Sequence, residues 1–214
     1  MSARRGCFIT LEGIEGAGKS SSIAFIRQRL GKARQAVEFT REPGGTPLAE
    51  ALRGVLLADW DERVPPLSEL LIVFAARAAH LNNKIWPLLE TGSWVVCDRF
   101  TDATYAYQGA GRGLGPAPVS VLEDMVQQSF RPDHVLVLDL PVEAGLARVR
   151  GRRGGDNRFD REQLSFMEAV RRCYRERASA QPERYTVIDA TQPPERVHDQ
   201  IDAVLSRLLQ QRCT

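Results

Sequence analysis

The chain has 214 residues, of which 43% are hydrophobic and 26% are charged, and its formal net charge is +2. Its length fits one compact domain, and its composition excludes collagen-like, disordered and membrane-spanning proteins, since the longest apolar run, Leu70–Ala76, is far shorter than the ~20 residues of a membrane helix. A net charge this small gives no reason to expect a nucleic acid as a partner.

The cysteines and the N-terminal segment indicate a cytoplasmic protein. Four cysteines are widely spaced and form no C-x-x-C pair, which disfavours a structural zinc site or a redox pair. Cys7 and Cys97 lie in apolar runs, where cysteine behaves as a small buried hydrophobic residue. Glu12 and Glu15 interrupt the apolar stretch after the basic N-terminus, which argues against a signal peptide.

Short apolar runs alternate with longer helical patterns along the chain. Five runs are predicted as strands: Cys7–Leu11, Val37–Thr40, Trp94–Cys97, Val135–Leu140 and Tyr185–Ile188. Helices are predicted after the first strand to about Leu30, and at Leu48–Leu57, Ser68–Leu89, Val119–Ser129, Val142–Arg150, Gln163–Ala180 and Glu195–Leu209. This alternation predicts an α/β fold with a parallel sheet covered on both faces, in which ligands bind beyond the carboxyl ends of the strands.

The first predicted strand is followed by a glycine-rich loop that matches G-x-x-x-x-G-K-[ST] in full. Its glycines allow backbone N–H groups to surround phosphate oxygens, and the helix that follows adds its positive end. Lys19 can reach the β- and γ-phosphates of a nucleotide, and the Ser20 hydroxyl can ligate Mg²⁺. The predicted ATP-binding residues are Gly13, Ile14, Glu15, Gly16, Ala17, Gly18, Lys19 and Ser20.

A phosphate loop alone fits a GTPase switch, an ATPase motor or a small-molecule kinase. The sequence contains no N-K-x-D guanine motif, which disfavours the GTPase switch, and a motor usually needs a larger chain. A second site, for a phosphate acceptor, would favour the kinase.

Charged residues also follow the second and third predicted strands. The second strand ends in Thr40–Thr46, T-R-E-P-G-G-T, and the third is followed by Asp98 and Arg99. Asp98 can hold Mg²⁺ through water, and Arg99 can bind a phosphate with two hydrogen bonds. Adjacent opposite charges are often ordinary surface ion pairs, but two such groups at the ligand edge of one sheet favour an acceptor site.

Together these segments resemble the thymidylate kinase family. The resemblance covers nearly the whole chain and is carried by L-E-G-I-E-G-A-G-K-S (11–20), T-R-E-P-G-G-T (40–46), F-A-A-R (74–77), D-R-F-T-D-A-T-Y-A-Y-Q-G (98–109) and the basic segment 148–158. It implies a P-loop NTPase fold: a single domain over residues 1–214 with a five-stranded parallel sheet and a short mobile lid at about 148–160.

The resemblance also implies an activity. Members of the family use ATP and Mg²⁺ to phosphorylate dTMP to dTDP for dTTP synthesis, and they are usually homodimers. Neither a nucleic acid nor a membrane is expected as a partner. A kinase for another pyrimidine monophosphate remains the alternative, and a GTPase switch is a more distant one.

Individual residues acquire roles from the same resemblance. Phe74 corresponds to an aromatic residue that stacks on thymine, Arg77 to an arginine near the base and phosphate, and Glu15 to an acid that faces the sugar 3′-hydroxyl. Arg99 corresponds to the dTMP phosphate ligand, and Asp98 to an acid near the metal. The remaining residues of the implied dTMP pocket are Pro43, Thr104, Tyr107 and Gln108. Without the resemblance, Phe74 would be read as a core residue and Thr104 as part of a polar helix face.

The resemblance places the catalytic arginine in the lid. Gly16 occupies the position at which one branch of the family carries an arginine, so the chain resembles the other, usually bacterial, branch. The segment 148–158 contains five arginines among glycines. Arg152 and Arg153 are favoured because glycines flank them, while Arg150 and Arg158 remain alternatives, since Gly154, Gly155 and Asn157 depart from the usual R-G-x-x-D-R-x-E pattern. The three histidines, His80, His134 and His198, have no metal-ligand spacing and receive no predicted role.

Overall fold

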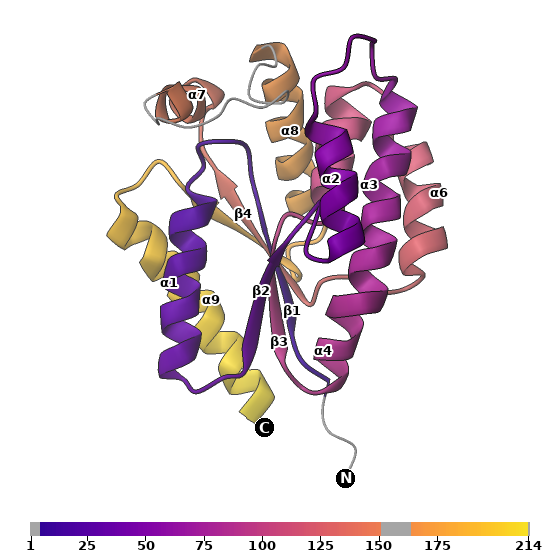
Figure 1. The fold of residues 1–214 in the computed structure, drawn as a ribbon. Helices are drawn as coiled ribbons and strands as arrows, with labels where there is room; N and C mark the ends of the chain where they lie inside the picture. The colour runs from indigo at the N-terminus through magenta and orange to yellow at the C-terminus, as the bar shows by residue number, and fades with distance from the viewer. Residues whose placement is uncertain (1–4, 151–163, 214) are drawn as a thin grey trace.

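The computed structural model of the chain describes residues 5–150 and 164–213. Within these residues, five parallel strands form one sheet in the order β2-β3-β1-β4-β5, which confirms the predicted fold (Figure 1). The strands are β1 (Phe8–Glu12), β2 (Val37–Arg41), β3 (Trp94–Asp98), β4 (His134–Asp139) and β5 (Tyr185–Asp189).

Four of the five strands end one residue later than predicted. The added residues are Glu12, Arg41, Asp98 and Asp189. All four are charged, so the apolar run in the sequence ends one residue before the strand does. Because all strands are parallel, these charged ends share one edge of the sheet, the upper edge in Figure 1, on the side away from both termini. The sheet therefore gathers its charged strand ends where ligands of such folds bind.

Helices cover both faces of the sheet, as predicted (Figure 1). One face carries α1 (Lys19–Lys32) and α9 (Pro194–Cys213), which pack against each other. The other face carries α3 (Pro66–His80), α4 (Trp86–Glu90) and α8 (Leu164–Ala180), with α2 (Pro47–Leu57) and α6 (Pro116–Gln127) packed against α3. α5 (Thr101–Thr104) and α7 (Val142–Arg150) follow the carboxyl ends of β3 and β4.

Two helical stretches contain π-helical turns. The first, η1 (Leu81–Ile85), joins α3 to α4, so the predicted helix Ser68–Leu89 is one helical run with a wider turn before Pro87, which has no N–H to donate. The second, η2 (Tyr105–Gly111), continues α5, and the sequence pattern does not predict this helical stretch. Wider turns of this kind are frequent at functional sites, and η2 carries two of the predicted substrate ligands, Tyr107 and Gln108.

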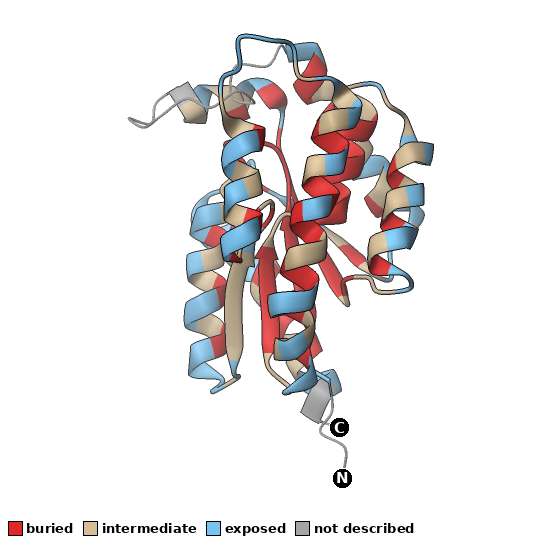
Figure 2. Ribbon diagram, turned by 45° about the vertical axis from the view of Figure 1, so that its right-hand side comes forward, coloured by how far each residue is buried: buried red, intermediate tan, exposed pale blue. Residues whose placement is uncertain are grey.

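The core occupies both sides of the sheet. β1 is buried along its whole length, and Cys7 and Cys97 are fully buried, as predicted. Figure 2 shows the buried residues along the strands and on the helix faces that are turned toward them. A buried sheet of this kind gives the loops at its carboxyl edge a rigid support. Among the described helices, none combines the length and the apolar character that a membrane crossing requires.

Candidate active site at the carboxyl edge of the sheet

The glycine-rich loop connects β1 to α1 and encloses a lysine. Gly13, Gly16 and Gly18 have φ angles of 135°, 79° and 92°, which glycine adopts without the steric cost that a side chain would add. The Lys19 Nζ atom donates a hydrogen bond to the Gly13 carbonyl oxygen at 3.0 Å. The ammonium group therefore lies against the loop itself, where the phosphates of a nucleotide need a positive charge.

The electrostatic surroundings of Lys19 favour an anionic ligand. Burial and the neighbouring Arg99 lower the pKa of Lys19 to about 8, although Asp98 and Glu15 act in the opposite direction. A phosphate in the loop would supply negative charge beside the ammonium group and so favour its charged form. The charged form of Lys19 is therefore stabilised when an anion binds in the loop.

Two glycines bring the loop into direct contact with α7. A Cβ atom at Gly16 would lie 2.2 Å from the carbonyl oxygen of Gly145, and a Cβ atom at Gly145 would lie 2.7 Å from the carbonyl oxygen of Glu15. Neither position has room for a side chain unless α7 moves. The sequence alone relates the glycine at position 16 to a catalytic arginine in the lid. The structure adds that an arginine at this position would collide with α7.

Arg99, Glu15 and Tyr107, three of the predicted site residues, meet where the loop faces the end of β3. Arg99 donates to Glu15 Oε1 at 2.6 Å and to the Gly13 carbonyl oxygen at 2.8 Å. The Tyr107 hydroxyl donates to Glu15 Oε2 at 2.7 Å. Burial opposes ionisation of Glu15, but Arg99 and Lys19 outweigh it and hold the pKa of Glu15 below its ordinary value. The site therefore contains a carboxylate–guanidinium pair at the phosphate loop.

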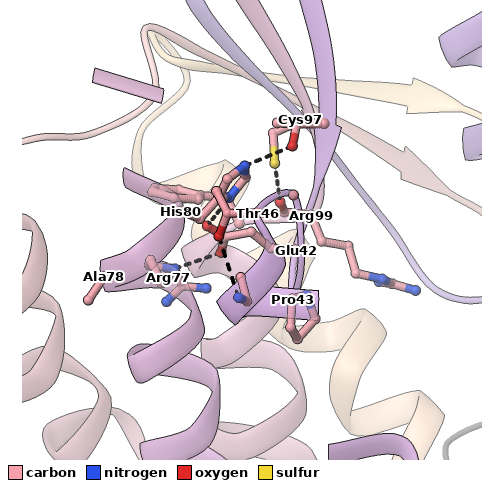
Figure 3. Close-up of polar contacts among 12 residues, drawn as sticks. Glu42, Pro43, Thr46, Arg77, Ala78, His80, Cys97 and Arg99 are labelled. Atoms are coloured by element: carbon pink, nitrogen blue, oxygen red, sulfur yellow. Dashed lines mark hydrogen bonds and ion pairs between the residues drawn. The ribbon is translucent and has the colours of Figure 1, made fainter. Parts of the chain in front are cut away.

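Arg99 adopts a backbone conformation that is uncommon for a residue with a side chain, with φ of 68°. Glu12, the last residue of β1, accepts a hydrogen bond from the next backbone N–H, that of Phe100, at 2.7 Å, and another from the Tyr174 hydroxyl at 3.0 Å. The Cys97 thiol donates to the Arg99 carbonyl oxygen at 3.0 Å (Figure 3). These contacts stabilise the turn from which the Arg99 side chain reaches the loop.

Burial, followed by the nearby Asp102, raises the pKa of Glu12 to about 8. Arg99 and the hydrogen bonds from Tyr174 and Phe100 act in the opposite direction. The sequence analysis predicts no role for Glu12 or Tyr174. The only sequence feature that could have indicated Glu12 is its position directly before the glycine-rich loop, where it interrupts an apolar run.

A cavity of about 600 Å³, its open mouth included, lies beside the Arg99–Glu15 pair. Its size suits a small-molecule ligand. The cavity is lined by seven residues predicted for substrate binding, namely Glu15, Pro43, Arg77, Arg99, Thr104, Tyr107 and Gln108. Residues without a predicted role complete the wall, among them Glu42, Arg53, Val73 and Phe100.

Phe74 is the predicted substrate ligand that does not line this cavity. Its side chain is 2% exposed and packs in an apolar cluster with Leu70, Tyr105 and Val119. The Arg77 guanidinium carbon lies 4.7 Å from the centre of the Phe74 ring, so the ring makes a cation–π contact with the arginine. The structure therefore places Phe74 next to a cavity residue and within the core.

Arg77 is almost completely buried, yet one of its amino groups is left for a ligand. Its Nε atom donates to Glu42 Oε2 at 2.8 Å (Figure 3). One terminal nitrogen donates to the Thr104 hydroxyl at 2.9 Å. The other terminal nitrogen is buried without a hydrogen-bond partner among the described residues. Because Arg77 lines the cavity, this donor is suited to an acceptor atom of the bound molecule.

Arg53, on α2, is a third arginine at the cavity wall, beside Arg77 and Arg99. It donates to the Pro43 carbonyl oxygen at 2.9 Å, and burial together with Arg41 lowers the pKa of Arg53. Its signal in the sequence is a single arginine within the apolar helix Leu48–Leu57. A lone arginine in such a helix is usually solvent-exposed, so the sequence pattern does not identify Arg53 as a site residue.

Asp98 and Ser20 fit a magnesium ion. Asp98 Oδ1 is buried and has no hydrogen-bond partner within the described part of the chain, which suits a carboxylate that ligates a cation. Ser20 stands in the first turn of α1, after Lys19. The described residues contain no cluster of three or more His, Cys, Asp or Glu that could hold a metal. Magnesium needs no such cluster, because it retains waters and binds substrate phosphates.

The lid arginines Arg152 and Arg153, with the alternative Arg158, lie outside the described residues. α7 leads toward them and is held at the phosphate loop by Arg148, which donates to the carbonyl oxygens of Gly16 at 3.3 Å and Ala190 at 3.1 Å. The start of the predicted lid is thus connected to the loop through described contacts.

Comparisons of the sequence and of the structure with known proteins agree on one family. The sequence model of a family described as Thymidylate kinase matches residues 11–201. A thymidylate kinase of Pseudomonas fluorescens SBW25 is 55% identical over 205 residues, which cover 96% of this chain and 97% of the relative. One of Alkalilimnicola ehrlichii is 50% identical over 94% of this chain and 93% of its own. The crystal structure of a thymidylate kinase from Ehrlichia chaffeensis has a TM-score of 0.75 at 31% identity and covers 94% of this chain and 99% of its own.

Proposed function

The chain belongs to the thymidylate kinase family, and from this premise we propose how its residues carry out the reaction. The enzyme transfers the γ-phosphate of ATP to dTMP and releases dTDP and ADP. The observation that carries the assignment of roles is the position of the Arg99–Glu15 pair, which lies between the phosphate loop and the cavity and contacts both.

The cavity is the proposed dTMP site. Of the three arginines at its wall, Arg99 and Arg53 would bind the dTMP phosphate. Arg77 would direct its unused amino group to the thymine base, beside Thr104 and Gln108. Pro43 contributes apolar surface. Phe74 stays a proposed thymine-stacking residue, in which role its ring would have to reach the base past the Arg77 side chain.

Glu15 and Tyr107 are the proposed sugar ligands. The Glu15 carboxylate can accept a hydrogen bond from the 3′-hydroxyl, and the Tyr107 ring would leave little room for a 2′-hydroxyl. Their mutual hydrogen bond fixes both side chains before the substrate arrives.

The phosphate loop Gly13–Ser20 is the proposed ATP site. Its N–H groups and Lys19 would hold the β- and γ-phosphates. Mg²⁺, held by Ser20 and Asp98, would supply positive charge to those phosphates. Lys19, Arg99 and a lid arginine, Arg152 or Arg153, would stabilise the negative charge of the transferring phosphoryl group, since phosphoryl transfer depends on positioning and electrostatic stabilisation.

A panel of acceptors tests the proposed specificity. With ATP and Mg²⁺ saturating, we expect kcat/KM for dTMP to exceed that for dUMP, UMP, CMP and AMP. The expected reason is that Arg77, Thr104 and Gln108 would contact the thymine base, while the Tyr107 ring would leave little room for a 2′-hydroxyl. Equal or faster turnover of UMP or CMP would support a kinase for another pyrimidine monophosphate, and GTP hydrolysis without an acceptor would support a GTPase switch.

We also propose that the enzyme is a homodimer. Four apolar side chains on the adjacent helices α3 and α6 are half-exposed or more, namely Leu67, Leu71, Val121 and Met125. A second copy of this chain is the proposed partner, because an exposed apolar face of this kind typically marks an interface. A single domain over residues 1–214 and a cytoplasmic location complete the proposal.

A further inference from the structure

Arg77 presents its unused amino group only while its guanidinium plane is fixed. A guanidinium group is planar, so two hydrogen bonds, from Nε to Glu42 and from one amino group to Thr104, determine the direction of the remaining one. Thr104 is held by helix α5. Glu42 lies in the loop after β2, and a loop glutamate requires a further contact to keep its orientation.

His80 supplies that contact. Its Nδ1 atom lies 3.0 Å from Glu42 Oε1, the carboxylate oxygen that Arg77 does not use (Figure 3). His80 follows Arg77 by three residues on α3, so both side chains reach Glu42 from one face of one helix. The histidine is fully buried, and a buried Glu42 with only one partner would leave an oxygen unsatisfied.

The far side of the His80 ring is fixed as well. Its Nε2 atom lies 2.7 Å from the Thr40 hydroxyl, and a Cβ atom at Gly45 would approach Nε2 to 2.4 Å. Since the Glu42 carboxylate accepts, Nδ1 is the donor of that contact, and Nε2 shares a hydrogen bond with the Thr40 hydroxyl. Contacts with Thr40 on β2 and with Glu42 in the loop after β2 therefore hold the ring in one orientation.

We propose that His80 is a positioning residue for dTMP: it holds Glu42 so that Glu42 holds Arg77 in the orientation that binds the base. This inference rests on the proposed dTMP site. It assigns a role to a histidine that does not line the cavity, and it makes the series Thr40–His80–Glu42–Arg77 one hydrogen-bonded unit.

His80→Leu introduces an apolar side chain of similar size and removes both hydrogen bonds. We expect its KM for dTMP to rise about tenfold, the cost of a lost buried hydrogen bond to a charged group, while KM for ATP and kcat stay within about twofold. His80→Asn, whose amide can still donate to Glu42, should recover much of the affinity for dTMP. His198→Leu is the matched control, because that histidine stacks on Phe25 between α1 and α9.

A double-mutant cycle with Arg77→Leu separates positioning from a general packing defect. If His80 acts through Arg77, the double variant binds dTMP no more weakly than Arg77→Leu alone, as measured by calorimetry. Additive losses, or equal increases in KM for dTMP and ATP, would overturn the inference. If His80→Leu does not fold, Thr40→Val tests the same unit without altering the core volume, and unchanged dTMP affinity in that variant would also overturn it. Failure of the wild-type enzyme to bind dTMP would defeat the proposed function instead.

Discussion

His134 shows how burial at a single residue changes the response of the whole protein to pH. It lies at the start of β4, where its Nε2 atom is 2.9 Å from the Thr186 hydroxyl. Burial, with the nearby Arg207, lowers the pKa of His134 to about 4. Between pH 6.5 and pH 4 the unfolded chain therefore binds a proton at this residue that the folded chain does not, and the free energy of unfolding must decrease as the pH falls through this range.

We expect His134→Gln to remove this dependence. Relative to the variant, the wild type should lose on the order of 3 kcal/mol of unfolding free energy between pH 6.5 and pH 4. Urea unfolding at several pH values measures the difference, with His198→Gln as the control. A constant difference between wild type and His134→Gln across this range would contradict the prediction.

At this same scale, the residues that sequence motifs could identify are those that stand in a recognisable pattern. Glu15, Arg99 and Tyr107 belong to such segments, and the structure brings them into contact. Glu12 belongs to the segment 11–20, but its partners Tyr174 and Phe100 are 162 and 88 residues away in the sequence. Arg53 is a single charge within an apolar helix and contacts Pro43, in the loop before that helix. Such contacts can be identified only from the folded structure.

The packing of α7 against the phosphate loop depends on a glycine. A Cβ atom at Gly145 would contact the backbone of the phosphate loop at 2.7 Å, whereas one at Gly54, inside α2, meets nothing within 4 Å. Both residues lie within helices, where alanine is intrinsically more favourable.

The two substitutions are expected to have opposite effects. Gly54→Ala should stabilise the protein by about 0.5–1 kcal/mol. Gly145→Ala should destabilise it by ~1–3 kcal/mol, because the loop or α7 must shift, and it should raise KM for ATP more than KM for dTMP. Thermal unfolding and steady-state kinetics measure both effects; stabilisation by Gly145→Ala would show that the contact is not close in solution.

Strands and long helices could be predicted because their apolar residues recur with a regular period. The helical stretch α5–η2 could not, since T-D-A-T-Y-A-Y-Q-G-A-G mixes glycines, β-branched residues and aromatics that carry low helix propensity. Its residues are nearly all buried, so tertiary contacts rather than local preference hold it helical.

For the whole molecule, the proposed dimer can be tested by its mass. Leu71 on α3 is 51% exposed, and Leu71→Glu would place a charge in the proposed interface. We expect light scattering to give about twice the chain mass of 23.9 kDa for the wild type and 23.9 kDa for the variant. Val187→Glu is the control, because Val187 is similarly exposed, at 46%, on the edge strand β5. A monomeric wild type would contradict the proposed homodimer.

The central place of β1 has a consequence for how the chain folds. β1 is the first strand to be synthesised, but its ladder with β3 extends to Asp98 and its ladder with β4 to Val137, so the second ladder closes only after more than half of the chain has been made. Pairing strands across such separations loses conformational entropy, because a large loop must close before the strand contacts form. This entropic cost slows folding. A nascent chain on the ribosome therefore carries its complete phosphate loop long before it can bind a nucleotide, and ATP can stabilise the fold only after β4 has docked beside β1.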